Sequence, residues 1–246
     1  MGVLDGKKVV IIGGSAGMGL ATAELSVREG AEVAIAARGV EDLERAAAKL
    51  EAAGGRPIRY RSLSIEDRPK VAAFLAELAP FDHLVMPGST VRPVRYDDLT
   101  HEEAHAAFDS KFWGPFWAAH DGRRHLRRGG SIVFYTGVAA KRPVSGYVMG
   151  ACINGALNAG TRSLALEFGP LGLRVNTIAP GLVDTPLQDR LHAHDKEARY
   201  REYGARLPVG RIGTAEECAL GALYLMTNGY VTGQVLGIDG GHEAME

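Results

Sequence analysis

The 246-residue sequence is poor in cysteine and has no metal-binding pattern. Its two cysteines, Cys152 and Cys218, are far apart, and neither has histidine or cysteine neighbours at the spacing that metal sites use. A disulfide framework needs more cysteines, and structural zinc sites need ligands at short, regular intervals. We therefore expect neither stabilising disulfides nor a metal site.

Long apolar runs and an excess of either charge are also absent. No hydrophobic stretch is long enough to cross a bilayer, and the run that follows Asp5, Lys7 and Lys8 is too short for a signal peptide. The formal net charge of −1 gives no reason to expect nucleic acid or an anionic membrane as a partner. The sequence predicts a soluble cytoplasmic protein.

Strand-like and helix-like segments alternate along the whole chain. Short apolar runs predict strands at residues 9–12, 33–37, 58–63, 84–86, 131–135, 173–178 and 235–238. Between them lie segments typical of helices at 41–53 and 67–78, and a helix that begins after a Thr100–Glu103 capping pattern. Such alternation predicts a single doubly wound α/β domain over residues 1–246, with a parallel sheet and helices on both faces. The long polar stretch 183–207 is expected to be irregular and to form a lid over a pocket.

A glycine-rich turn joins the first strand to the first helix. Gly13 permits a tight turn, Gly17 lets the backbone approach a phosphate, and Gly19 lets the helix pack against the strand. The helix that follows begins with free N–H groups and the positive end of its dipole, which suits a pyrophosphate. This turn predicts dinucleotide binding.

Further segments carry a family resemblance over nearly the whole chain. They are Gly-Gly-Ser-Ile-Val at 129–133, Thr-Arg-Ser-Leu-Ala-Leu-Glu at 161–167, Arg-Val-Asn-Thr-Ile-Ala-Pro-Gly at 174–181, and the runs at 210–217 and 231–241. With the glycine turn, they resemble the short-chain dehydrogenase/reductase family. The resemblance implies a Rossmann-type domain with a seven-stranded parallel sheet, a nicotinamide cofactor, a small-molecule substrate, and a homotetramer or homodimer built on the fourth and fifth helices.

The end of the second strand indicates which nicotinamide cofactor binds. NAD-specific sites place a carboxylate there for the ribose hydroxyls, but this chain has Arg38 and no acid. Arg38 could pair with a ribose 2′-phosphate and Ser15 could donate to the same group, although Arg38 could also be a solvated residue after a strand. We predict NADP(H). With the positions that the resemblance adds, the expected cofactor residues are Gly13, Ser15, Gly17, Met18, Gly19, Arg38, Ser64, Pro87, Gly88, Pro180, Gly181, Val183 and Thr185.

The catalytic residues of the family are missing. The resemblance places its Tyr-x-x-x-Lys pair at positions 150 and 154, where this chain has Gly150 and Asn154. It places the serine at 137 and a supporting asparagine at 111, where this chain has Gly137 and Lys111. Lysine and asparagine therefore look exchanged, so both groups would remain in the site if the two positions face each other.

Other side chains are candidates for the missing roles. Tyr147 lies one turn before position 150, where a glycine would leave space for its ring, and Thr136 could supply the lost hydroxyl. The predicted catalytic set is thus Tyr147, Lys111, Asn154 and Thr136. The alternatives are a core or subunit-contact role for Tyr147 and a plain strand-end role for Thr136. Of the histidines, 83, 101, 105 and 120 are expected on the surface or on helix faces, and 192 and 194 in the lid, within possible reach of substrate.

Three functions remain open on this evidence. The favoured one is an NADPH-dependent oxidoreductase that reduces a carbonyl, or oxidises a hydroxyl, of a small molecule with a rearranged acid/base site. The second is a non-catalytic NADPH-binding sensor or regulatory subunit. The third is a non-redox enzyme, such as a dehydratase or isomerase, in which the cofactor is structural.

Overall fold

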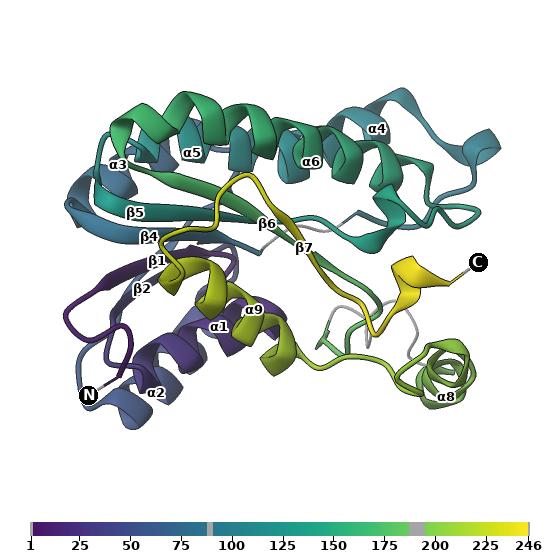
Figure 1. Ribbon diagram of the computed structural model, residues 1–246, viewed down its shortest axis with the longest axis horizontal. Helices are drawn as coiled ribbons and strands as arrows, with labels where there is room; N and C mark the ends of the chain where they lie inside the picture. Colours follow the sequence, from purple (N-terminus) through teal and green to yellow (C-terminus); the bar gives the residue numbers. More distant parts are fainter. Residues whose placement is uncertain (1, 88–90, 187–194, 246) are drawn as a thin grey trace.

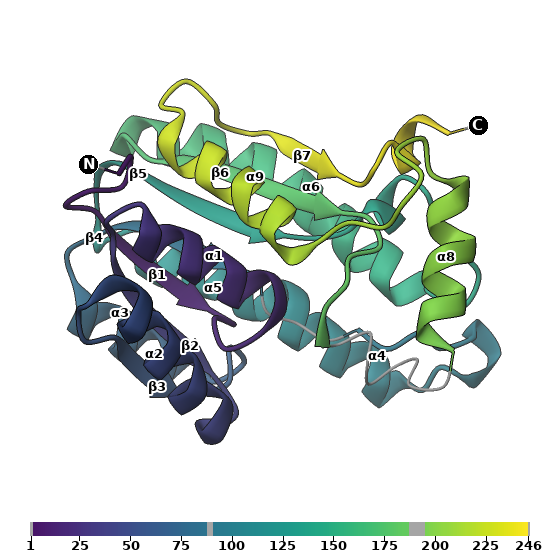
Figure 2. The ribbon, with the colours of Figure 1, turned by 90° about the horizontal axis from the view of Figure 1, so that it is seen from below.

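A seven-stranded parallel sheet forms the centre of the protein (Figures 1 and 2). The computed structural model describes residues 2–87, 91–186 and 195–245. The strand order is β3-β2-β1-β4-β5-β6-β7, and neighbouring strands are parallel throughout. The strands are β1 (Lys8–Ile12), β2 (Glu32–Ala37), β3 (Arg59–Ser62), β4 (Phe81–Met86), β5 (Leu126–Tyr135), β6 (Arg174–Pro180) and β7 (Val235–Ile238). This arrangement confirms the doubly wound α/β fold.

Helices cover both faces of the sheet (Figure 1). One face carries α1 (Gly17–Arg28), α2 (Val40–Gly54) and α9 (Ala215–Thr227). The other carries α3 (Arg68–Leu78), α5 (Gly114–Gly122) and α6 (Val148–Phe168), with α4 (His101–Phe108) before α5. Within the described residues, no helix is long and apolar enough to span a membrane.

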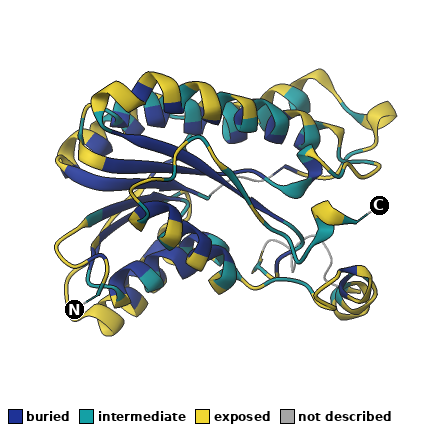
Figure 3. Ribbon diagram, viewed as in Figure 1, coloured by how far each residue is buried: buried dark blue, intermediate teal, exposed yellow. Residues whose placement is uncertain are grey.

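The inner strands are largely apolar because both of their faces are covered, whereas β3 at the edge of the sheet is polar and exposed. In β1, Val9 and Ile11 pack into the core beneath α1, α2 and α9, whereas Val10 and Ile12 pack into the opposite core. Side chains alternate between the two faces of a strand, so a strand covered on both sides needs an unbroken apolar run. Figure 3 shows the inner strands in the colour of buried residues.

Local signals set several helix ends, and the cap expected at Thr100 is confirmed. Thr100 and Glu103 form a complete capping box at the start of α4, and Thr214 and Glu217 form another at the start of α9. Gly55 ends α2 with a φ of 63°, in the left-handed region that favours glycine.

Two predictions about the elements are wrong. Residues 183–207 are not irregular throughout, because Lys196–Arg206 form a helix, α8; residues 187–194, with His192 and His194, lie outside the described ranges. The polar composition of this segment favoured a loop over a helix. In the structure, Tyr200 and Tyr203 attach the helix to the rest of the fold through hydrogen bonds to Asp184 and His242. Strand β5 begins at Leu126 instead of 131, because its first residues already pair with Phe81 of β4.

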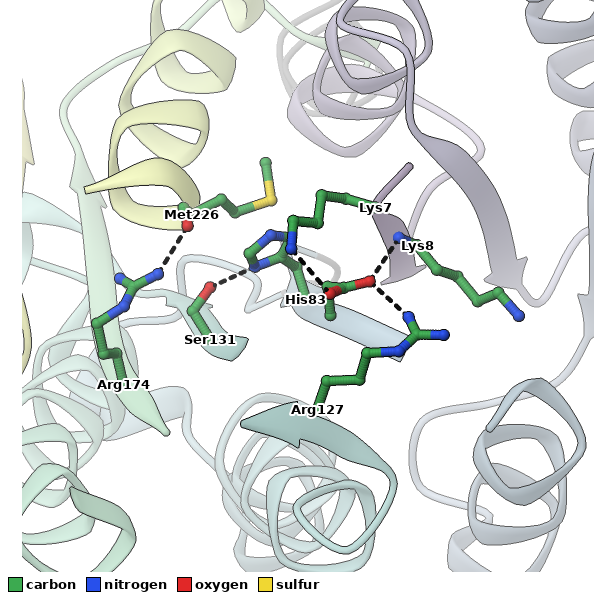
Figure 4. A network of polar contacts seen from close by, with 8 residues as sticks. Lys7, Lys8, His83, Arg127, Ser131, Arg174 and Met226 are labelled. Carbon is green, nitrogen blue, oxygen red and sulfur yellow. Dashed lines mark hydrogen bonds and ion pairs between the residues drawn. The ribbon is translucent and has the colours of Figure 1, made fainter. Parts of the chain in front are cut away.

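His83 is not on the surface, contrary to expectation. It is 4% exposed in the middle of the sheet, and its Nδ1 lies 2.9 Å from the Ser131 hydroxyl oxygen (Figure 4). The expected strand 84–86 lacks the first residues of β4, so position 83 falls outside the expected strand but inside the real one. Burial lowers the pKa of His83 to about 4.

At the amino-terminal ends of the central strands, the Asp82 carboxylate links three neighbouring segments of the chain. Asp82 accepts hydrogen bonds from the Lys8 backbone at 2.9 Å, from Arg127 at 2.7 Å and from Lys7 Nζ at 3.4 Å (Figure 4). These partners come from β1, β5 and the turn before β1, at the opposite end of the strands from the glycine turn.

Candidate active site

A cleft of about 660 Å³ lies at the carboxyl ends of β1, β2 and β4. In the strand order, β1 stands between β2 and β4, which is the crossing point where doubly wound sheets bind ligands. Its lining includes nine of the predicted cofactor residues, namely Gly13, Ser15, Gly17, Met18, Gly19, Arg38, Ser64, Pro87 and Thr185. Pro180, Gly181 and Val183 do not line it, and Gly88 lies outside the described residues.

The three glycines of the turn are required by its geometry. Gly13 and Gly17 have φ values of 101° and 53°, in the region that side chains disfavour. A Cβ at Gly19 would lie 2.0 Å from the Gly13 carbonyl oxygen, so a side chain there would break the contact between helix and strand. No side chain caps α1 at Ala16, so its first N–H groups remain available to an anion in the cleft. The turn therefore fits a dinucleotide pyrophosphate.

Arg38 stands at the end of β2 with its guanidinium uncommitted. Its backbone oxygen accepts a hydrogen bond from Ser62, but its side chain forms no ion pair with any residue that the structure describes. Asp42 also lines the cleft nearby, and its carboxylate is paired with Arg45. Sequence reasoning missed Asp42, whose charge would otherwise oppose a phosphate. The arrangement suits a 2′-phosphate at Arg38.

Lys111 lies on a π-helical turn (Asp109–Trp113) between α4 and α5. Its side chain is buried, at 9% exposed, and its Nζ donates to the Thr136 carbonyl oxygen at 3.5 Å. No carboxylate in the described parts of the chain pairs with it. Burial alone lowers the pKa of Lys111 to about 8. Single π turns inside helices are often found at functional sites, because they redirect one side chain at a cost in helix stability.

Asn154 faces the backbone where the family serine is missing. A Cβ at Gly137 would lie 3.0 Å from Asn154 Nδ2, so the amide fills space beside that glycine. Asn154 is 1% exposed, and its Oδ1 has no hydrogen-bond partner. A buried polar atom without a partner is unfavourable unless a ligand or water completes it. Gly137 follows Thr136 directly, so Lys111 and Asn154 meet the same short stretch of backbone at the end of β5.

The Thr136 hydroxyl has partners within the fold. It donates to Asn158 Oδ1 at 2.9 Å and lies 3.4 Å from the Ile178 carbonyl oxygen. The carbonyl oxygen of Thr136, rather than its hydroxyl, contacts Lys111. Sequence reasoning missed Asn158, although its position one turn after Asn154 places it on the same face of α6.

Tyr147 occupies the place left open by Gly150. It is the residue before α6, and a Cβ at Gly150 would lie 2.1 Å from its Cε1 atom. Burial raises the pKa of Tyr147, and its hydroxyl makes no hydrogen bond to any other described residue. The absence of a side chain at position 150 therefore leaves space, and the Tyr147 ring occupies it.

Known proteins with similar sequences and structures cover the whole chain. The family described as enoyl-(acyl carrier protein) reductase matches residues 13–243. The short-chain reductase protein NovJ of Streptomyces niveus is 33% identical, over 94% of this chain and 92% of its own. A small-chain dehydrogenase solved in complex with NADPH is 32% identical with a TM-score of 0.82, covering 97% of this chain and 99% of that one. An NADPH-bound short chain oxidoreductase of Pseudomonas aeruginosa PAO1, described as containing an atypical catalytic center, is 28% identical with a TM-score of 0.90, covering 99% of both chains.

Proposed function

Because the chain belongs to the short-chain dehydrogenase/reductase family of nicotinamide-dependent oxidoreductases, we propose that it reduces a carbonyl group of a small molecule with NADPH, using a rearranged acid/base site. The observation that carries this proposal is the buried Lys111 ammonium, which has no counter-charge among the described residues and lies at the same backbone turn as Asn154. A buried ammonium without a counter-charge is costly, and a role in the chemistry would explain why it is there.

Different residues of the cleft would bind different groups of the cofactor. The N–H groups at the start of α1 would hold the pyrophosphate, and Arg38 with Ser15 would hold the 2′-phosphate. Bound there, NADPH supplies a hydride to the substrate carbon. The chain must then supply a proton to the carbonyl oxygen.

Lys111 is the better of the two proton donors. Its pKa of about 8 keeps it largely protonated at neutral pH and near the value that suits acid catalysis. Tyr147 has a raised pKa, so it stays neutral and donates a hydrogen bond that orients the carbonyl oxygen. In the transfer, one N–H bond of Lys111 breaks, the O–H bond of the product alcohol forms, and solvent returns a proton to the amine. The Thr136 carbonyl oxygen accepts a hydrogen bond from the lysine and holds it in place.

The proposal is tested by following nicotinamide absorbance with NADPH and a panel of aldehydes and ketones. We expect turnover that Lys111→Met lowers at least about a hundredfold while NADPH affinity stays unchanged. Lys49→Met, an exposed lysine on α2, is the matched control and should leave turnover unchanged. Product without a change in absorbance would favour the non-redox enzyme. Tight NADPH binding without any turnover would favour the sensor or regulatory subunit, and either outcome overturns the proposal.

Two further properties stay predictions from the resemblance and the composition. These are the homotetramer or homodimer and the cytoplasmic location. Neither is needed for the chemistry above.

A further inference from the structure

The cleft extends beyond the predicted cofactor residues along a second wall, which we call the α4 wall. It consists of the lining residues from the segment 91–110, which contains α4, together with Met149 in the first turn of α6. Helix α4 contacts α6 (Figure 1), and the Val94 N–H donates a hydrogen bond to the Gly146 carbonyl oxygen at 2.8 Å. The α4 wall is therefore attached to the chain just before Tyr147.

The α4 wall reaches the groups to which the proposed reduction assigns the proton. Ser110 lines the cleft directly before Lys111, and Met149 lines it two residues after Tyr147. A substrate whose carbonyl oxygen lies near these two groups would place the rest of its body against the α4 wall. The side chains of this wall therefore determine which substrates fit.

Most residues of the α4 wall are apolar. Val91, Val94, Leu99 and Met149 line it together with two alanines of α4, and Val91 is only 6% exposed. Aliphatic and thioether side chains offer dispersion contacts but no strong hydrogen bonds, so they favour an apolar ligand. This part of the cleft suits an alkyl or aryl group.

The two charged residues of the α4 wall neutralise each other. Arg92 forms an ion pair with Glu103, whose carboxylate also completes the capping box of α4 with Thr100. The Thr100 backbone N–H and the Arg92 guanidinium lower the pKa of Glu103, so its carboxylate stays ionised. The Arg92 and Glu103 side chains are 66% and 36% exposed, so the pair lies on the solvent side of the wall.

Taking the proposed reduction as the reaction, we infer that the substrate is an uncharged ketone or aldehyde with an apolar body, and that Glu103 sets this preference by neutralising Arg92. A substrate carboxylate would have to displace Glu103 from Arg92, and a substrate cation would have to displace Arg92 from Glu103. An apolar body contacts the aliphatic side chains and leaves the ion pair intact.

Two ketones of equal length test this preference. They are octan-2-one and 7-oxooctanoate, which carries a carboxylate in place of the terminal methyl group. We expect the wild type to reduce octan-2-one with a kcat/KM at least about tenfold higher than that for 7-oxooctanoate. Nicotinamide absorbance measures both rates.

Glu103→Gln tests the role of the ion pair. Glutamine also completes a capping box, so this variant keeps the start of α4 but leaves Arg92 without a counter-charge. We expect kcat/KM for 7-oxooctanoate to rise about three- to tenfold while that for octan-2-one stays unchanged. Because the pair is exposed, about 0.5 M sodium chloride should abolish this gain. Glu102→Gln, an exposed carboxylate on α4 outside the cleft lining, is the matched control and should change neither value.

Met149→Gln tests the apolar part of the wall. The new side chain has a similar length but is polar, so kcat/KM for octan-2-one should fall about three- to tenfold. Met149→Leu keeps an apolar side chain of similar volume and should stay within about twofold of the wild type. Equal effects of the two variants would contradict an apolar contact at this position, and circular dichroism separates lost contact from lost folding.

Binding measured without turnover separates this preference from the proposed reduction. In Lys111→Met loaded with NADPH, reduction is slow, so the fluorescence of the bound NADPH reports ketone binding alone. If octan-2-one binds to this variant but the wild type reduces neither ketone, the proposed reduction fails and the preference holds. If the wild type reduces 7-oxooctanoate as fast as octan-2-one, or if Glu103→Gln does not improve 7-oxooctanoate, the preference is overturned while the reduction stands. Failure of octan-2-one to bind the loaded variant also overturns the preference.

Discussion

The ring of Tyr147 fills the volume that a side chain at Gly150 would need. The position where the resemblance expects a tyrosine is a glycine, and the Tyr147 ring lies over it. Lys111 and Asn154 both lie beside the backbone of Thr136 and Gly137, so the exchange that the resemblance suggests keeps the two groups near each other.

Gly150→Ala should displace the Tyr147 ring. The new methyl group would lie 2.1 Å from the ring, so the ring must leave its place, and we expect a loss of about 1–3 kcal/mol in unfolding free energy together with a loss of turnover. Urea unfolding and activity measure the two effects. Gly155→Ala is the control on the same helix, where a Cβ meets nothing within 4 Å. It should stabilise the protein by about 0.5–1 kcal/mol. Equal effects of the two variants would contradict the steric argument.

Carbonyl reduction should slow as pH rises through about 8. Burial lowers the pKa of Lys111 to about 8, and the reduction needs the protonated amine, so kcat/KM should fall with increasing pH above this value. The reverse oxidation needs the free amine, so its kcat/KM should rise as the pH increases toward about 8. In Lys111→Arg the fall of kcat/KM should shift to a pH beyond the measurable range, because arginine stays protonated. A fall that stays at the same pH in this variant would assign the titration to another group.

Acid should destabilise the fold through His83. Burial lowers the pKa of this histidine from 6.5 in the unfolded chain to about 4 in the folded one. Between these values the unfolded state binds more protons, so stability rises with pH and is lost as pH falls from about 6.5 toward 4. We expect a loss of about 2 kcal/mol between pH 7.5 and pH 5.

The measurement for His83 is a difference between two proteins. Urea unfolding at both pH values is compared for the wild type and His83→Gln, which keeps an amide near Ser131 but does not titrate. Asp82 also has a lowered pKa and contributes to both proteins alike, so it cancels in the comparison. An identical pH dependence in the two proteins would show that His83 does not titrate as described.

Arg38→Ala should change the choice of cofactor. Without the guanidinium the 2′-phosphate loses a charge-assisted contact, so NADPH affinity should fall about 10- to 100-fold while NADH affinity changes little. Isothermal titration with each cofactor measures this. Arg56→Ala, an exposed arginine outside the cleft, is the control for net charge. Parallel losses for both cofactors would point to a role of Arg38 in folding instead of phosphate recognition.

The sequence predicted features that depend on local chemistry. The glycine turn, the apolar strands and the Thr100–Glu103 cap follow from backbone geometry and side-chain spacing within a few residues. The burial of His83 and the partners of Thr136 depend on contacts between strands and helices distant in sequence, which spacing does not reveal. The π turn at Lys111 depends in the same way on the packing of its neighbours.

The contact between Lys8 and Asp82 has a consequence for how the chain reaches this fold. The two residues are 74 positions apart, and they join β1 to β4 at the centre of the sheet. A growing chain therefore has a half-paired central strand until residue 86 has left the ribosome, with one apolar edge unprotected. Stalling synthesis before that point should leave β1 as the unpaired edge, whereas stalling after it should move the unpaired edge to β4, which pairs with β5 only later.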